Sequence, residues 1–218
     1  DMVARKKLID QLLSRGQVDD AIREYLDLAD THYRLADLDM ARRTYTTALR
    51  VVQQTNADRK WNIHILQRMA DIDMQRLDWK QAIRVYEQIR TLRPDDEEVR
   101  KNLIELSLRL GQPAQANAEI ENYLTYLQTH GHSEKGIKLV EALLADRPND
   151  VVLRRALAQL YQQAGRVDEA VAQLDSLAES MLDVGKKEEA MVVINQILLM
   201  GPPNAEQYRQ LLMQLQSG

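Results

Sequence analysis

The chain of 218 residues has no cysteine, no phenylalanine and only five prolines. Without cysteine it can form no disulfide, no thiolate nucleophile and no zinc site with thiolate ligands. A cysteine-free sequence also fits a reducing compartment, so we expect a cytoplasmic protein. Aromatic residues make up only 5% of the chain, whereas Ala, Leu, Gln, Arg and Glu recur throughout. This composition favours helix over strand.

An excess of positive charge and a long hydrophobic run are also missing. The net charge is -4 and the isoelectric point is near 5.7, which argues against a general electrostatic attraction to nucleic acid or anionic lipid. No apolar run approaches the roughly 18 residues of a membrane span, and the first residues lack the apolar stretch of a signal peptide. We therefore expect neither nucleic acid nor a membrane as partner. Because the sequence begins at an aspartate, we also expect a fragment of a longer protein.

The glycines recur at a fixed distance from a very small residue. Five of the eight are followed five residues later by alanine or glycine. The pairs are Gly16 and Ala21, Gly111 and Ala116, Gly131 and Gly136, Gly165 and Ala170, and Gly185 and Ala190. An apolar stripe at helical spacing follows each small residue. Each segment is predicted to be the second helix of a hairpin, because glycine permits the tight turn and a small residue lets two helices approach closely.

Two further segments keep the small residue and the apolar stripe but lack the glycine. Their small residues are Ala41 and Ala82, and their turns hold Ala36 and Leu77 where the other turns hold glycine. Prolines supply the remaining punctuation, because three of them lie twelve residues after a small residue, where a second helix should stop. These are Pro94, Pro148 and Pro202.

This order of glycine, small residue, tyrosine or aliphatic residue and proline resembles the tetratricopeptide repeat, a helix-turn-helix unit of about 34 residues. The resemblance covers nearly the whole chain and is best from Trp61 to Pro94, with Ala70 in the first helix and Ala82 in the second. Successive small residues are 20, 41, 34, 20, 34 and 20 residues apart. We interpret an interval of 20 as one helix that serves in two hairpins. The interval of 41 indicates a repeat with a seven-residue loop insertion around Gln53 to Lys60.

The resemblance implies an all-α fold, a right-handed α-solenoid of stacked antiparallel helical hairpins with about 12 helices. We expect a single repeat domain over residues 1–218 that ends in a capping helix at 204–216. The expected repeat units are 2–35, 22–54, 59–94, 95–129, 117–148, 150–184 and 171–202. The expected helices before the capping helix are 2–14, 18–35, 38–54, 59–76, 79–92, 95–110, 113–129, 133–146, 150–164, 167–184 and 187–200.

No residue pattern indicates catalysis, a cofactor or a metal. The only compact candidate is His130 with His132, which lie in a predicted turn and have Glu134 as the only adjacent carboxylate, a poor ligand set. No glycine-rich phosphate loop and no hydrolase motif occurs. The acidic run at residues 95–98 has capping-box spacing, so we interpret Asp95 as the start of a helix. We expect a chain that is not an enzyme and that needs no cofactor.

In the tetratricopeptide family the first helix of each hairpin lines a concave groove suited to an extended peptide or a helix. The resemblance implies a partner-binding groove of nine residues: Gln67, Asp71, Gln75, Lys101, Glu105, Arg109, Arg155, Gln159 and Gln163. Some family members clamp a C-terminal carboxylate with Lys and Asn, but the best-matching repeat here has Gln67 and Asp71. We therefore expect no binding of acidic EEVD-type tails.

The expected function is a protein–protein interaction scaffold or adaptor that binds a protein or peptide in this groove. We expect a monomer or a weak homo-oligomer. A second interpretation stays open at this point. The alternative is a regulatory or sensory module of a larger signalling or transcription-regulating protein whose catalytic or DNA-binding domain lies outside these residues.

Overall fold

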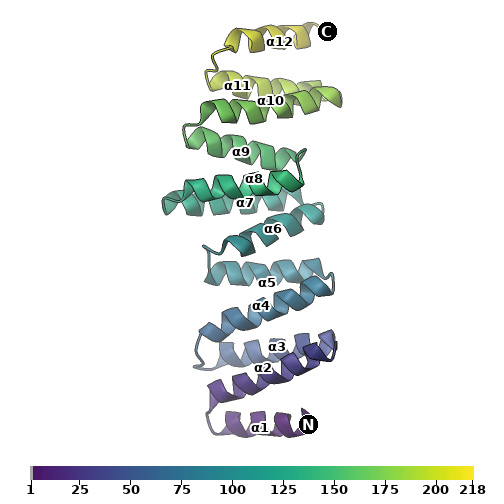
Figure 1. Ribbon diagram of the computed structural model, residues 1–218, viewed down its shortest axis with the longest axis vertical. Helices are drawn as coiled ribbons and strands as arrows, with labels where there is room; N and C mark the ends of the chain where they lie inside the picture. Colours follow the sequence, from purple (N-terminus) through teal and green to yellow (C-terminus); the bar gives the residue numbers. More distant parts are fainter. Residues whose placement is uncertain (1) are drawn as a thin grey trace. The chain divides into compact units, whose positions relative to one another are not determined.

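The computed structural model describes residues 2–218, which form twelve helices and no strand (Figure 1). The predicted all-α fold of about 12 helices is confirmed, and no helix end differs from its predicted position by more than two residues. The helices are α1 (Met2–Ser14), α2 (Val18–Arg34), α3 (Leu38–Gln54), α4 (Lys60–Gln75), α5 (Trp79–Leu92), α6 (Glu97–Arg109), α7 (Pro113–Thr129), α8 (Ser133–Asp146), α9 (Val151–Gln163), α10 (Val167–Asp183), α11 (Lys187–Leu199) and α12 (Ala205–Ser217).

The helices form two compact units, one that ends at Leu106 and one that covers Ser107–Gly218. Within each unit helices pack against their neighbours in sequence, as in α2 on α3 or α9 on α10. The small residues predicted to lie between helices are fully buried, and Ala82 and Ala170 are both 0% exposed. At Gly136 a Cβ atom would lie 2.9 Å from a methyl group of Leu124. Each unit is therefore a stack of antiparallel hairpins whose helices meet at small residues.

The turns between paired helices use a left-handed residue to end the first helix. At Gly165, φ is 75°, and the following Arg166 N–H donates to the carbonyl of Tyr161 at 2.8 Å. This bond satisfies a carbonyl that would otherwise be left without a partner at the helix end. Glycine suits the position because it has no side chain to clash in the left-handed region.

Two turns hold this conformation without glycine. Ala36 and Leu77 both have φ of 57°, and the turn at Leu77 keeps the same bond, from the Asp78 N–H to the carbonyl of Asp73 at 2.9 Å. The Leu77 side chain is 69% exposed, so its packing offers little compensation. A left-handed conformation costs a residue with a Cβ about 1–2 kcal/mol. The two turns without glycine are therefore strained.

Replacing Leu77 with glycine is expected to raise the free energy of unfolding by about 0.5–1 kcal/mol. The substitution removes the left-handed strain, and the greater freedom of glycine in the unfolded chain offsets only part of that gain. Urea unfolding would measure the difference. Leu77→Ala, which keeps the Cβ atom, is the matched control and should show no comparable gain. A midpoint for Leu77→Gly at or below that of the parent chain would contradict the strain.

The predicted loop insertion lies between α3 and α4, at residues 55–59. The indole N–H of Trp61 donates to the Asp19 carboxylate at 2.8 Å, which ties the start of α4 to the first turn of α2.

One predicted helix cap, that of α6, is wrong. Asp96 caps α6, because its carboxylate accepts from the Val99 N–H at 3.2 Å, and Asp95 lies in the preceding turn. The turn begun by Pro94 places the cap one residue later than predicted, and α6 begins at Glu97.

Candidate partner-binding grooves

The first unit has an open groove of about 430 Å³ between α4, α5 and α6, which we call the α4–α6 groove. Two of the predicted residues, Gln67 and Asp71, line this groove on α4. Its complete lining is His64, Gln67, Arg68, Ala70, Asp71, Tyr86, Ile89, Asp96, Glu98, Val99 and Asn102. The groove thus runs from the polar stripe on α4 to the start of α6, the first helix of the next hairpin.

The other predicted residues of α4 and α6 lie elsewhere. Gln75 donates a side-chain hydrogen bond to the hydroxyl of Tyr33. Lys101 and Glu105 lie 4.0 Å apart as an ion pair along α6, and neither lines the α4–α6 groove. Arg109 is exposed in the last turn of α6. The structure therefore brings Gln67 and Asp71 together and leaves these four residues outside the groove.

Arg68, which the sequence did not single out, links three helices beside the groove. Its guanidinium donates to the Asp30 carboxylate at 2.8 Å and to the Tyr45 hydroxyl at 3.2 Å, and it lies over the ring of Tyr33, 5.0 Å from the centroid. Burial alone would raise the pKa of Asp30, but the hydrogen bonds from Tyr45 and Arg68 outweigh it and lower that pKa. The hydrogen bonds that Arg68 makes with Tyr45 and Asp30 raise the pKa of Arg68. The positive charge of Arg68 is thus largely committed to the fold.

Two buried tyrosines of the first unit hold their protons to a higher pH than an exposed tyrosine does. Burial and the hydrogen bond to Asp30 raise the pKa of Tyr45 to about 12. Burial, with the charges of Asp71 and Glu98, raises the pKa of Tyr86 to about 12. The unfolded chain loses these phenol protons at about pH 10. Above that pH the folded state binds more protons than the unfolded state, so stability falls as the pH rises.

We therefore expect the contribution of these tyrosines to stability to be complete below about pH 10 and to be lost between about pH 10 and about pH 12. Urea unfolding across this range, with tyrosinate absorbance followed in parallel, measures the loss. Tyr86→Phe removes one titrating group and should make the fall shallower. If the free energy of unfolding stays level up to about pH 12, the two hydroxyls are not held protonated by the fold.

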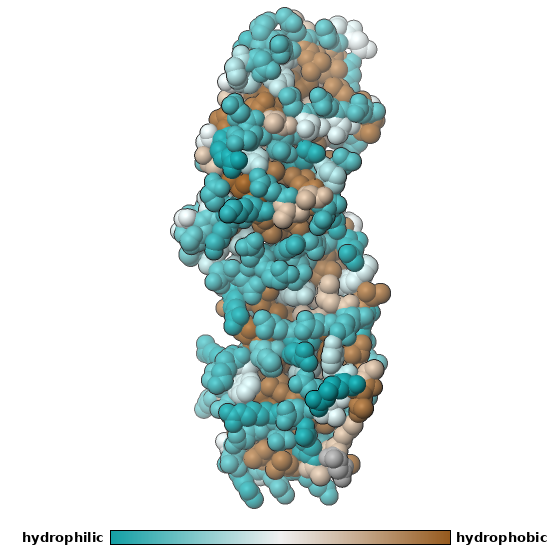
Figure 2. All heavy atoms as spheres, in the orientation of Figure 1, coloured by the Kyte–Doolittle hydropathy of each residue, from teal (hydrophilic) through white to brown (hydrophobic). Residues whose placement is uncertain are grey.

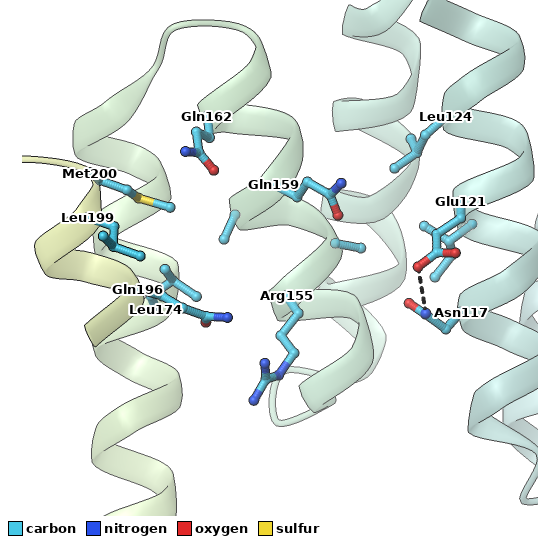
Figure 3. Close-up of a pocket in the computed structure, with 13 residues that line it drawn as sticks. Asn117, Glu121, Leu124, Arg155, Gln159, Gln162, Leu174, Gln196, Leu199 and Met200 are labelled. Carbon is cyan, nitrogen blue, oxygen red and sulfur yellow. Dashed lines mark hydrogen bonds between the residues drawn. The ribbon is translucent and has the colours of Figure 1, made fainter. Parts of the chain in front are cut away.

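The second unit has a groove of about 470 Å³ beside α9, which we call the α7–α11 groove (Figure 3). Polar side chains of α9 lie in it between those of α7 and those of α11, and Asn117 donates to Glu121 at 2.9 Å on its α7 side. The full lining is Asn117, Ile120, Glu121, Leu124, Arg155, Ala156, Ala158, Gln159, Gln162, Leu174, Gln196, Leu199 and Met200.

Two of the three predicted α9 residues, Arg155 and Gln159, line the α7–α11 groove. The third, Gln163, accepts a hydrogen bond from the side-chain amide of Gln128 instead. Among the described residues no hydrogen bond or ion pair engages the side chain of Arg155 or of Gln159. Leu199 is 88% exposed at the α11 side. The groove therefore offers amides, one uncommitted cation and an apolar edge.

His130 of the predicted turn makes local contacts in the structure. The His130 ring stacks on Tyr126, with centroids 4.1 Å apart, and its Nδ1 lies 2.7 Å from the Tyr126 carbonyl oxygen. Within residues 2–218 no group of three or more His, Asp or Glu residues is placed to hold a metal ion. Over the same residues no helix is both long and apolar enough to cross a membrane.

Stacked antiparallel hairpins with grooves along alternate helices define a helical-repeat protein. The family model of the tetratricopeptide repeat matches residues 74–129 and 127–183. Together these segments cover just over half of the 218 residues. The chain belongs to the tetratricopeptide repeat family, as its glycine and small-residue spacing predicted.

Several solved structures resemble the chain. A tetratricopeptide repeat protein from Parabacteroides merdae ATCC 43184 is 16% identical, covers 99% of this chain and 98% of its own, and has a TM-score of 0.37. MamA is 17% identical, covers 78% of this chain and 96% of its own, and has a TM-score of 0.42. YrrB, described as a TPR protein with an unusual peptide-binding site, is 13% identical, covers 78% of this chain and 91% of its own, and has a TM-score of 0.39. A search of curated proteins finds no match.

Proposed function

We propose that this chain is a non-catalytic scaffold that binds a peptide or protein partner in the α4–α6 and α7–α11 grooves. The observation that carries the proposal is which polar side chains are hydrogen-bonded within the fold and which are not. Those between helices, such as Arg42, are paired within the fold, whereas Gln67, Arg155 and Gln159 lie in open grooves and are paired with no described residue. Side chains that the fold does not use remain available to a partner.

The chemistry of the grooves suits a polypeptide. A glutamine side chain carries both a donor and an acceptor, so it can pair with the N–H and the C=O of an extended main chain whatever its sequence. Amides line both grooves, at Gln67 and Asn102 in the first unit and at Gln159, Gln162 and Gln196 in the second. All nine predicted residues belong to the proposal, with Gln67, Asp71, Arg155 and Gln159 as its central members.

The proposal has further parts that rest on the sequence. The chain acts as one repeat domain, without a cofactor, as a monomer or weak homo-oligomer, and in the cytoplasm. A regulatory or sensory module of a larger protein would use the same grooves to receive its signal. Family membership supports the interaction role, because stacked helical repeats expose extended surfaces for partners. The mainly hydrophilic surface in the view of Figure 2 suits a partner recognised through polar contacts.

A random peptide library displayed on phage and selected on the protein would test this function. Selected peptides should bind in a fluorescence anisotropy titration, and Gln67→Ala or Gln159→Ala should weaken at least one of them about fivefold or more. Gln81→Ala and Gln115→Ala change exposed glutamines outside both grooves and serve as matched controls. An acidic EEVD-type peptide is the negative probe. If no peptide is selected, or if groove and control variants behave alike, the proposed function is wrong.

A further inference from the structure

The α4–α6 groove contains the hydroxyl of a largely buried tyrosine, and the fold does not use this hydroxyl. Tyr86 is 9% exposed and lines the groove from α5, yet its hydroxyl has no hydrogen-bond partner among residues 2–218. Buried tyrosines normally pair their hydroxyl group. Three others in this chain do so with a carboxylate: Tyr45 with Asp30, Tyr161 with Glu141, and Tyr208 with Asp175.

Two carboxylates at the same groove also lack a strong partner within the fold. Glu98, at the start of α6, makes no hydrogen bond or ion pair with a described residue. Asp71, on α4, comes only within 4.0 Å of Arg68, whose guanidinium is already bound to Asp30 and Tyr45. Both carboxylates act on Tyr86, since their charges help to raise the pKa of its hydroxyl.

The charges of the groove lining leave an excess of negative charge. The lining holds three carboxylates, those of Asp71, Asp96 and Glu98, against the single cation Arg68 and the histidine His64. Asp96 is occupied as a helix cap, which leaves Asp71 and Glu98 for a ligand. An anionic group would be repelled here, and a neutral amide would leave both charges uncompensated.

The floor of the groove is apolar. Ala70, Ile89 and Val99 line it and are 1%, 0% and 5% exposed. An apolar floor under a negatively charged rim matches a side chain with an aliphatic stem and a cationic head, as in lysine or arginine. A lysine ammonium group carries three donors, and the two carboxylates and the Tyr86 hydroxyl supply three acceptors.

We propose that Asp71, Tyr86 and Glu98 form a subsite for a basic side chain of the partner polypeptide. The stem of that side chain lies over the apolar floor beside Val99, and its charged head lies among the three polar groups. This inference rests on the proposed function and adds to it the chemistry of one partner residue. It concerns the first unit alone.

Anisotropy titrations with three fluorescein-labelled peptides of equal length, oligo-lysine, oligo-arginine and oligo-glutamate, test the subsite. The parent chain should bind a basic peptide and not oligo-glutamate. Glu98→Gln and Tyr86→Phe should each weaken basic-peptide binding about three- to tenfold. Glu97→Gln is the matched control, because Glu97 lies in the same helical turn and outside the groove. Its effect should stay within about twofold, since it alters only the general charge.

Equal losses in Glu97→Gln and Glu98→Gln would show a diffuse attraction to an acidic surface and would overturn the subsite. No binding of either basic peptide, or a preference for oligo-glutamate, would overturn it as well. Melting temperatures of each variant establish that the fold is intact, and Asp71→Asn tests the α4 side independently. If library-selected peptides bind in the groove but carry no basic residue, the scaffold function stands and this inference fails. If no peptide is selected from the library, the scaffold function fails, and the oligo-lysine titration still decides the subsite.

Discussion

Replacing Arg42 with alanine is expected to lower the free energy of unfolding by about 3 kcal/mol. Arg42 on α3 binds Asp73 on α4 through two hydrogen bonds, at 2.8 Å and 2.9 Å. The Asp73 side chain is only 2% exposed and that of Arg42 is 16% exposed. Removing the guanidinium leaves a carboxylate buried without a counterion, and breaking a buried pair in this way typically costs about 3–5 kcal/mol. Urea unfolding of the variant measures the loss.

The neighbouring pair between the same two helices supplies the control. Arg76 lies 2.9 Å from Asp39, but these side chains are 36% and 69% exposed. Arg76→Ala should therefore cost less than about 1 kcal/mol. The double variant Arg42→Met with Asp73→Leu removes both buried charges and should recover most of the stability. If Arg42→Ala lowers the free energy of unfolding no more than Arg76→Ala does, the burial of the Arg42–Asp73 pair does not stabilise the fold as expected.

The hairpin architecture was predictable because its signals are local. A left-handed turn is required within a few residues of a helix end, and a close helix contact requires a small side chain, so glycine and alanine at fixed spacing reveal both. Ala82 and Ala170 are fully buried as this reasoning requires. Even the two turns without glycine, at Ala36 and Leu77, kept the left-handed conformation. The surrounding hairpin imposes the left-handed conformation on residues that rarely adopt it.

The polar links between helices could not be predicted, because they depend on how each helix is rotated about its axis. Arg42 and Asp73 are 31 residues apart, and Arg68 and Asp30 are 38 apart. Spacing along one helix says which residues share a face, but it does not say which face of another helix they meet. The prediction of the α6 cap failed for a smaller reason, since the turn begun by Pro94 moved the cap from Asp95 to Asp96.

The candidate site was predictable to a limited extent. The family's first-helix rule led to Gln67 and Asp71 on α4 and to Arg155 and Gln159 on α9, which line the grooves. On α6 the residues at the groove are Glu98 and Asn102, not Lys101 or Glu105. At about 100° per residue, Asn102 is rotated by about 100° from Lys101. Glu98 and Glu105 share a face of α6, but they lie about two turns apart along the helix. Tyr86 was missed as a groove residue because its position in the second helix identified it only as part of the apolar stripe.

Removal of α12, by ending the chain at Gly201, is expected to lower the melting temperature by about 10 °C. Tyr208 and Leu212 of α12 are 6% and 8% exposed, and they lie in one apolar cluster with Ile194 and Ile197 of α11. The Tyr208 hydroxyl also donates to Asp175 on α10 at 2.8 Å. Burying two such side chains contributes about 3–5 kcal/mol, and each kcal/mol is worth about 2–4 °C in a chain of this size. Removing α12 also uncovers the α11 side chains, so added binding of a hydrophobic dye should accompany the lower melting temperature.

Single substitutions in α12 separate loss of packing from loss of chain length. Leu212→Ala should cost about 2–3 kcal/mol because it removes a buried side chain and leaves a cavity. Met213→Ala alters the next residue, which is 60% exposed, and should change stability by less than about 0.5 kcal/mol. A helix that shields the α10 and α11 surface must show this contrast, since burial alone distinguishes the two positions. If the shortened chain melts at the parent temperature without added dye binding, and Leu212→Ala matches Met213→Ala, then α12 contributes nothing to the second unit's core.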